Sequence, residues 1–212
     1  GPRIHILERR PVLPEDVASL VQQLADCMNV FNVGAKLVES CKQQPDLIPE
    51  VFGALKKLLQ HKDGCIVSYG CRLVLELWDE TMDIVQEILP LMTSASSEVR
   101  RLARDILLKM CTKQPDLVPE VLATARKLLQ HDDDHIVENG CRMVLELCDE
   151  TMDIVQEILP LMESASPGVR GLAREILLKV CQKQPDSVPE VVCALRSYYS
   201  IKMAASLQLA VR

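Results

Sequence analysis

The sequence feature that most restricts the possible folds of this chain is a segment that recurs at an interval of 70 residues. Residues 44–51 read Gln-Pro-Asp-Leu-Ile-Pro-Glu-Val, and nearly the same sequence returns at 114–121 and at 184–191. Residues 41–110 align with 111–180 without a gap and are identical at 49 of 70 positions. Such repeats indicate a fold built from stacked copies of one structural unit. Because the identity runs through the whole copy, it reflects recent duplication and does not by itself mark functional residues.

Apolar residues within each copy recur at helical spacing. Ile66, Tyr69, Leu73, Val74 and Leu77 follow one another mostly three or four residues apart, which places them on one face of a helix. No segment alternates between apolar and polar residues over the length of a strand. Each copy therefore predicts two helix pairs of about 35 residues. In the first copy the four helices are expected at 46–61, 65–78, 81–92 and 97–112.

Capping residues and prolines mark the expected helix ends. Ser166 followed by Pro167 predicts an N-cap hydroxyl and a proline at the first helical position, where its missing N–H is tolerated. The same capping role is predicted for Thr81, Asp46 and Asp116. Pro90 and Pro160 lie inside sequences that otherwise read as helix, so each is expected to kink its helix.

Two segments resemble a known repeat family. Residues 82–109 and 152–179 are similar to HEAT repeats, which have a proline in the first helix and Val-Arg-x-x-Ala-x-x-x-Leu in the second. The segment 127–147 is closer to an armadillo repeat. HEAT repeats usually place an Asp in the turn to pair with the arginine, whereas this chain has Ser94 and Ser164 there. The resemblance therefore implies the helical hairpin but not the inter-repeat Asp–Arg ladder.

The resemblance covers 44–183 and implies an all-α fold, an α-α superhelix (HEAT/armadillo-like solenoid) of about 12 helices in about 6 helix pairs. Helix pairs bury their apolar faces only against neighbours, so a curved rod and a single domain over 1–212 are expected. Its expected parts are a tail over 1–11, which opens with a Gly-Pro typical of a removed tag, a degenerate helix pair over 12–43, duplicated units over 44–110 and 111–180, and closing helices over 181–212.

Composition narrows the range of functions. The chain is 48% apolar and 25% charged, which is typical of a folded protein, and it has no apolar run of the roughly 20 residues that span a bilayer. It lacks hydrolase, nucleotide-binding and Cys-x-x-Cys motifs. We therefore expect no enzyme activity and no cofactor.

The nine cysteines are odd in number and several recur with the repeat. The repeating positions are Cys41, Cys111 and Cys181, and Cys71 and Cys141. We interpret them as small core residues of an intracellular protein, cytoplasmic or nuclear, because reducing compartments keep thiols unpaired. Trp78, which the second copy replaces with Cys148, is likewise expected in the core.

Two histidines form a weak candidate metal site. His131 and His135 stand four residues apart around three aspartates, a spacing that can hold a divalent ion. The first copy keeps only His61 and one acid in this stretch, which lies at an expected turn. Solvated charge at a turn is the favoured interpretation, so no metal is predicted. Differences between the copies at 62–69 are interpreted as drift at this turn.

Two basic stripes are candidates for nucleic-acid binding. They run along 97–113 and 167–183, whereas the whole chain has 24 Lys and Arg against 30 Asp and Glu, a net charge of −6. The acidic balance opposes attraction to phosphates, so a salt-bridged helix face is favoured over a nucleic-acid site. The stripe residues are Arg100, Arg101, Arg104, Lys109 and Lys113, and Arg170, Arg174, Lys179 and Lys183.

A series of charged residues on the second helices is the candidate partner-binding site. Polar residues recur one turn apart, as Ser68 does before Arg72 and as Glu138 does before Arg142, and some pairs such as Glu138 with Arg142 are expected to form i,i+4 contacts. In the families that this chain resembles, the second helices line a concave, peptide-binding surface. We name the candidate residues the charge ladder: Arg72, Glu76, Arg100, Arg104, Arg142, Glu146, Arg170 and Arg174.

The function expected from these features is that of a protein-protein interaction scaffold with a peptide or protein partner. A nucleic-acid-binding repeat protein and a non-catalytic regulatory subunit of a larger complex remain alternatives. Homo-oligomers that pair through the ends of the rod are also possible, and the apolar segment Met203–Val211 is a candidate cap for one end.

Overall fold

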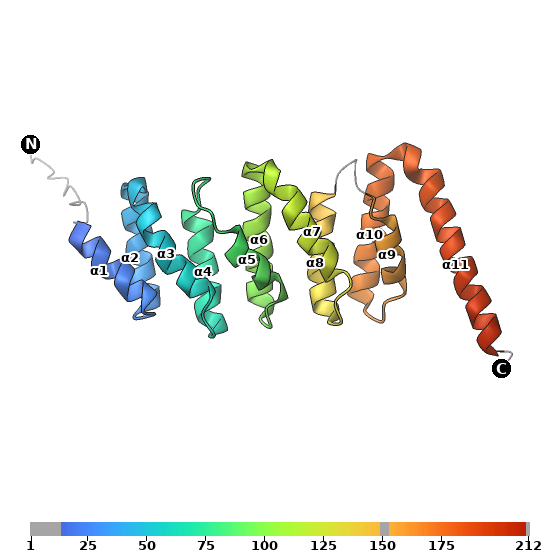
Figure 1. Cartoon of the computed structure of the whole chain (residues 1–212), viewed down its shortest axis with the longest axis horizontal. Helices are drawn as coiled ribbons and strands as arrows, with labels where there is room; N and C mark the ends of the chain where they lie inside the picture. The colour runs from blue at the N-terminus through green and yellow to red at the C-terminus, as the bar shows by residue number, and fades with distance from the viewer. Residues whose placement is uncertain (1–13, 149–152, 211–212) are drawn as a thin grey trace, which may run out of the picture. The chain divides into compact units, whose positions relative to one another are not determined.

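The structure is a computed structural model that describes residues 14–148 and 153–210. Within these ranges the chain forms eleven α-helices and five short 3-10 helices, and no strand (Figure 1). The predicted all-α class is confirmed. The chain divides into two compact units, Gly1–Ile106 and Leu107–Arg212, so the expectation of one continuous domain stays a prediction. No helix of the described residues is long and apolar enough to cross a membrane.

The first unit consists of antiparallel helices packed in successive pairs. Helix α1 packs on α2 and α3, α3 packs on α4, and α2 also contacts α4. Aliphatic side chains such as those of Val17, Leu37, Leu55 and Val74 are almost fully buried between them. The elements are α1 (Pro14–Ala25), α2 (Val30–Gln43), η1 (Pro45–Leu47), α3 (Ile48–Leu59), α4 (Gly64–Leu77), α5 (Val85–Ile88), η2 (Leu89–Thr93) and the first part of α6 (Ser97–Lys113).

The second unit repeats this arrangement. Helix α7 packs on α8, α8 packs on α10, and α10 contacts α9 and η4. Where the sequence predicts more than one closing helix over 181–212, the described chain ends, after the last turns of α10 and the short η5, in one helix of 23 residues, α11. After the second part of α6, the elements are η3 (Pro115–Leu117), α7 (Val118–Leu128), α8 (Asp134–Leu147), α9 (Val155–Ile158), η4 (Leu159–Glu163), α10 (Pro167–Lys183), η5 (Pro185–Ser187) and α11 (Val188–Ala210).

The predicted cap at Ser166 is confirmed, whereas the other three are wrong. The hydroxyl of Ser166 accepts a hydrogen bond from the Val169 N–H at 3.3 Å. Asp46 and Asp116 instead lie within the 3-10 turns η1 and η3, which lead directly into α3 and α7 without a side-chain cap. The 3-10 backbone bonds there satisfy amide donors that a capping side chain would otherwise serve. At Thr81 the chain is not yet helical, and its N–H donates to the Asp79 carboxylate at 2.8 Å.

The two internal prolines shorten their helices more than predicted. Each segment was expected to be one kinked helix, but α5 and α9 span a single α-helical turn and continue as the 3-10 helices η2 and η4. Pro90 and Pro160 stand at the starts of these 3-10 segments. A proline has no N–H to donate, so it removes one bond of the α-helical ladder at this point.

Trp78 and most of the cysteines that recur with the repeat lie in the core, as the sequence predicts. Cys41, Cys71, Cys111 and Cys141 are buried and Cys181 is half-buried, and all nine thiols are free. Trp78 is 8% exposed, and its indole N–H has no hydrogen-bond partner among the described residues. The core interpretation is confirmed for Trp78 and the buried cysteines, whereas Cys27 is half-buried and Cys65 and Cys193 are exposed.

Candidate protein-binding surface

In the first unit, the charge ladder residues of α4 are neutralised by neighbouring helices. Arg72 forms an ion pair with Glu98 of α6, and Glu76 lies 3.8 Å from the ammonium of Lys42 on α2. The side chains of Arg72 and Glu76 are both more than half exposed. Exposed pairs of this kind contribute about 1 kcal/mol or less each. Their main effect is to cancel charge on this surface.

In the second unit, the same two positions have lost these partners. Arg142 and Glu146 are both exposed on α8, at positions equivalent to those of Arg72 and Glu76 on α4. Gly168 now stands where Glu98 stood, and Thr112 stands where Lys42 stood. Neither Arg142 nor Glu146 forms an ion pair with any part of the chain that the structure describes. The second unit therefore presents both charges to solvent.

The carboxylate missing at Gly168 is supplied from the facing helix. Glu138 of α8 accepts a hydrogen bond from the Ser166 hydroxyl at 3.2 Å, and a Cβ atom added to Gly168 would overlap the Glu138 carboxyl group. Glu138 thus occupies the space beside the N-terminus of α10, where negative charge is stabilised by the helix dipole. The predicted pairing of Glu138 with Arg142 is replaced by this contact.

Ser68, the first-copy equivalent of Glu138, does not lie where the sequence predicts. Ser68 was expected in the exposed polar stripe, but it is only 6% exposed. The change from Ser68 to Glu138 thus coincides with the change from Glu98 to Gly168, 30 residues further along the chain. These two differences are structurally coupled, which the interpretation of this edge as simple drift did not anticipate.

Two arginines of the charge ladder hold their own hairpin turns. Arg100 donates to the Ser94 carbonyl oxygen at 2.7 Å, and Arg170 donates to the Ser164 carbonyl oxygen at 2.7 Å. Both arginines are half-buried. The serine that replaces the usual HEAT aspartate therefore provides its backbone oxygen instead of a carboxylate. These two guanidinium groups are engaged within the fold.

The remaining ladder positions differ between the copies. Arg104 is half-buried on α6, whereas Arg174 is exposed on α10 and forms no ion pair with the described residues. The structure thus separates the eight predicted residues into those engaged in internal contacts and those open to solvent. The group open to solvent, which has no ion pair with the described residues, consists of Arg142, Glu146 and Arg174.

A further charged pair, which the sequence alone did not reveal, joins the first and third helices of each copy. In the first unit Lys56 of α3 lies 3.2 Å from Glu87 of α5. In the second unit Arg126 of α7 donates from Nε to both Glu157 carboxylate oxygens at 3.1 Å, and from Nη2 to the Asp153 carbonyl oxygen at 3.1 Å. The hydrogen bond from Arg126 to Glu157 raises the pKa of Arg126. The sequence signal for this pair was that both charges recur after 70 residues, the cation at 56 and 126 and the carboxylate at 87 and 157.

The histidines of the candidate metal site build a turn. The Asp133 N–H donates to His131 Nδ1 at 3.0 Å, and the His135 N–H donates to the Asp133 carboxylate at 2.8 Å, which caps α8. His61 and Asp63 form the same two bonds before α4. Among the described residues no group of three or more potential metal ligands is gathered. Because both copies have this geometry, we interpret the motif as one that starts the following helix.

Several cations of the two basic stripes also bind within the chain. Arg101 pairs with Asp105 at 3.3 Å, and the Lys179 ammonium donates to the Leu145 carbonyl oxygen. With Arg100 and Arg170 bound to their turns, these groups contribute to the fold as well as to the surface charge.

Comparison with known proteins identifies the fold. No protein-family model matches the sequence, and no curated protein is significantly similar to it. One similar solved structure concerns TOG-tubulin binding specificity (13% identity, 84% of this chain and 87% of that chain, TM-score 0.53). Another is a computationally designed armadillo repeat protein for modular peptide recognition (16% identity, 91% and 92%, TM-score 0.52). At these identities the likeness concerns the fold, and this chain has a HEAT/armadillo-like helical-repeat fold.

Proposed function

We propose that this protein is a non-catalytic protein-protein interaction scaffold that binds a peptide or protein segment on the charge ladder residues of its second unit. The observation that carries the proposal is the loss of intramolecular ion pairs at Arg142 and Glu146 on α8. Their first-copy counterparts, Arg72 and Glu76, are paired within the fold. We place the partner's main polar contacts on Arg142, Glu146 and Arg174.

The chemistry of these groups suits a peptide. A guanidinium can bind a carboxylate through two parallel hydrogen bonds, and a carboxylate accepts hydrogen bonds from amides or from a lysine. Solved structures with a similar fold include an armadillo design for peptide recognition and a chain from a TOG-tubulin binding study, which supports the same class of function here. Loss of the two exposed ion pairs costs the fold little, because each contributes about 1 kcal/mol or less.

A protein partner is favoured over a nucleic acid by charge. The net charge of −6 opposes a polyanion, and four cations of the basic stripes are already bound within the chain. Binding to nucleic acid would also depend steeply on salt concentration. We place the protein inside the cell, where its free thiols would stay reduced.

Selection from a peptide library tests the proposal and identifies the partner sequence at the same time. A phage-displayed library is selected on the purified chain, and the dissociation constants of the best peptides are measured by fluorescence anisotropy. Charge reversal at both positions that lack an ion pair, Arg142→Glu with Glu146→Lys, should weaken binding by roughly tenfold or more, equivalent to about 1.4 kcal/mol. The matched control, Arg72→Glu with Glu76→Lys, should change it by less than about threefold.

Two results would reject this assignment. Peptides whose affinity is unchanged by reversal in the second copy would show that the released charges are not the binding site. Peptides whose affinity falls equally with both double variants would show that the absence of ion pairs in the second copy does not matter for binding.

A further inference from the structure

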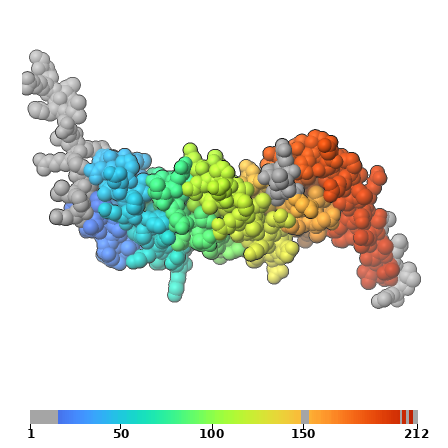
Figure 2. All heavy atoms as spheres, turned by 45° about the horizontal axis from the view of Figure 1, so that its top comes forward, coloured from blue at the N-terminus to red at the C-terminus, as the bar shows by residue number. Residues whose placement is uncertain are grey.

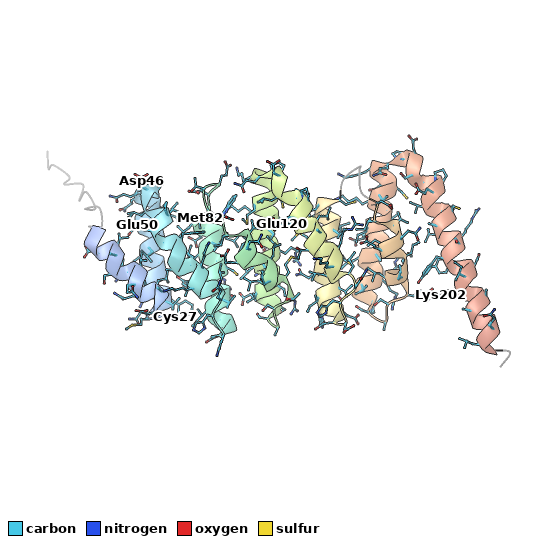
Figure 3. All side chains as sticks on the ribbon, in the orientation of Figure 1. Cys27, Asp46, Glu50, Met82, Glu120 and Lys202 are labelled. Atoms are coloured by element: carbon cyan, nitrogen blue, oxygen red, sulfur yellow. The ribbon has the colours of Figure 1, made fainter. Side chains whose placement is uncertain are left out.

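Two aromatic side chains lie against each other on the surface of the first unit. Phe31 of α2 is 65% exposed, and its ring centroid lies 4.7 Å from that of the half-buried Tyr69 on α4. Phe31 is the second residue of α2 and follows the turn that contains Cys27, labelled in Figure 3. Figure 2 shows the first unit, coloured from blue to green, as closely packed helices on the face in view. We name Phe31 and Tyr69 the aromatic pair, and it stands on packed helices rather than on a loop.

The aromatic pair is held in place by a hydrogen bond and by a glycine. The Tyr69 hydroxyl donates to the Phe31 carbonyl oxygen at 3.0 Å. Gly34, one turn after Phe31, lies against the tyrosine ring, so that an added Cβ would stand 2.5 Å from Tyr69 Oη. The residues 70 and 140 positions further along the chain are Arg104 and Arg174. A glycine inside a helix lowers helix stability relative to alanine, so room for the tyrosine ring is made here at a cost to the helix.

The exposure of Phe31 is a property of its position in the repeat and not of its place near the start of the chain. The residue 70 positions further along is Arg101 of α6, whose side chain is 54% exposed. Helix α6 has helices before and after it in the chain. The next equivalent is Gly171 of α10, where an added Cβ would meet nothing within 4 Å beyond its own helix backbone and chain neighbours. This position is therefore open to solvent in all three helices.

Two other aromatic rings of this chain are covered by a lysine that stands four residues further along the same helix. The ammonium-to-centroid distances are 4.4 Å for Lys56 over Phe52 and 5.7 Å for Lys202 over Tyr198. Four residues after Phe31 stands Ala35, which is exposed. In the part of the chain that the structure describes, no cation lies over the rings of the aromatic pair. The place that a lysine occupies over the other two rings is thus open over Phe31.

The charge of the first unit favours a cation in this place. Residues 14–106 carry 14 Asp and Glu against 9 Lys and Arg, and such an excess of negative charge attracts a basic segment and repels a polyanion. Burial and, after it, the negative charge of Glu76 raise the pKa of Tyr69, so its hydroxyl keeps the proton that it donates to Phe31. The faces of aromatic rings are themselves negative and attract cations. Ring and surrounding charge therefore favour the same kind of ligand.

We propose that the aromatic pair binds an arginine side chain of a partner protein, whose guanidinium group stacks on the exposed Phe31 ring in the place that lysines occupy over Phe52 and Tyr198. Arginine is preferred to lysine because its planar guanidinium is more weakly hydrated and stacks on a ring that remains in contact with water. The surface belongs to the first unit and contains none of the three residues on which the proposed function depends. The inference therefore goes beyond that function and does not rest on it.

Nuclear magnetic resonance of the whole chain, with ¹³C-labelled phenylalanine and tyrosine rings, tests the proposal. The chain has 2 Phe and 3 Tyr, so substitution of single rings assigns every signal. Titration with the peptide Gly-Ser-Arg-Gly-Arg-Ser-Gly at low ionic strength should shift the Phe31 signals along a saturable curve. The signals of Phe52, whose ring Lys56 already covers, should stay in place and serve as the internal control. Phe31→Leu, read from the Tyr69 signals, should weaken binding about fivefold or more, and Phe31→Trp should strengthen it.

Control peptides and variants define what is recognised. The peptide with citrulline in place of each arginine keeps the shape of the side chain without its charge and should bind about fivefold more weakly, and the peptide with lysine about twofold more weakly. Leu178→Ser removes an apolar side chain of α10 that is 62% exposed, and it should change binding by less than about twofold. The ladder variant Arg142→Glu with Glu146→Lys should bind the arginine peptide normally, which separates a failure of this proposal from a failure of the proposed function.

Several results would overturn the proposal. Absence of a saturable shift, equal affinity for the citrulline peptide, or unchanged affinity in Phe31→Leu would show that no cation binds on the ring. Equal affinity for the lysine peptide would overturn the choice of arginine. Tighter saturable binding of a single-stranded oligothymidylate at the Phe31 signals would assign the aromatic pair to nucleic acid and would overturn the proposal as well.

Discussion

Arg72 on α4 is paired with Glu98 on α6, and this pair has no equivalent in the second copy, where Gly168 takes the place of the glutamate. The change does more than delete a charge, because the facing helix gains Glu138, whose carboxylate accepts a hydrogen bond from Ser166. One duplicated surface is therefore neutral in the first copy and carries unpaired charge at Arg142 in the second.

The coupling between Glu138 and Gly168 predicts a non-additive pair of substitutions. Gly168→Glu alone should displace the flexible Glu138 side chain and break its bond to Ser166. Combined with Glu138→Ser, the introduced carboxylate should instead pair with Arg142, as in the first copy. Urea unfolding of the two single variants and the double variant should give a favourable coupling of about 0.5–1 kcal/mol. Strictly additive changes would show that the two sites are independent.

Close packing of α8 on α7 predicts opposite effects for two glycines. Gly140→Ala should lower the free energy of unfolding by about 1–3 kcal/mol, because its Cβ would meet Leu128 and the Ala125 backbone. At Gly171, on α10, an added Cβ would meet nothing within 4 Å beyond its own helix backbone and chain neighbours, so Gly171→Ala should raise stability by up to about 1 kcal/mol through helix propensity. Thermal unfolding of both variants measures the difference, and equal effects would contradict the packing described.

Burial predicts which thiols react. It raises the pKa of Cys71 and of Cys141 to about 12, whereas Cys65 and Cys193 are exposed. Only thiolates react, so iodoacetamide at pH 8 should modify the two exposed thiols within minutes and the two buried thiols only after unfolding. Peptide mass mapping over time provides the measurement. Rapid modification of Cys71 in the folded chain would be incompatible with its burial.

The same pKa shifts predict how stability depends on pH. A buried thiol with a folded-state pKa of about 12 keeps its proton over a range in which an unfolded thiol, at 9.0, has lost it. The contribution of Cys71 and Cys141 is therefore fully present below pH 9 and is lost as the pH rises toward 12. Urea midpoints at pH 8 and pH 10.5, compared between the wild type and Cys71→Ala, test this: the variant should lose less stability at the higher pH.

The two arginines of α10 should behave differently. Arg170→Gln removes a charge-assisted bond to the Ser164 carbonyl oxygen and should destabilise the second unit by about 1–2 kcal/mol. Arg174→Gln, at an exposed position without an ion pair in the described residues, should change stability by no more than about 0.5 kcal/mol. Chemical denaturation of the two variants distinguishes them. A larger loss at Arg174 would reverse their assigned roles.

The helices were predictable from sequence because their apolar residues recur at helical spacing and because each helix of the repeated unit occurs twice in the sequence. The ends were less predictable. Asp46 was predicted to cap a helix by its residue type, but a 3-10 turn precedes α3 and satisfies the backbone there. The predicted helix start at Thr81 failed because the Asp79 carboxylate forms a local turn. Competition between side-chain and backbone bonds decides such cases.

The candidate site was predictable only as a set of positions. The sequence shows that Arg72 and Arg142 are equivalent, but their partners depend on how neighbouring helices align, and Glu98 is 26 residues away from Arg72. Arg100 was assigned to the binding surface because it is charged, whereas it binds the Ser94 carbonyl oxygen. Helix register and backbone acceptors are tertiary features that a single sequence does not display.

The most direct test of the central claim is a charge swap between Arg142 and the peptide that the second copy selects. A selected peptide that contains an acidic residue is synthesised with that residue and with arginine in its place, and each form is titrated against the wild type, Arg142→Glu and Arg72→Glu. We predict that the acidic form prefers the wild type, that the arginine form recovers about tenfold or more in affinity on Arg142→Glu, and that Arg72→Glu behaves like the wild type. No recovery for any acidic position of the peptide, or an equal recovery on Arg72→Glu, would contradict the claim.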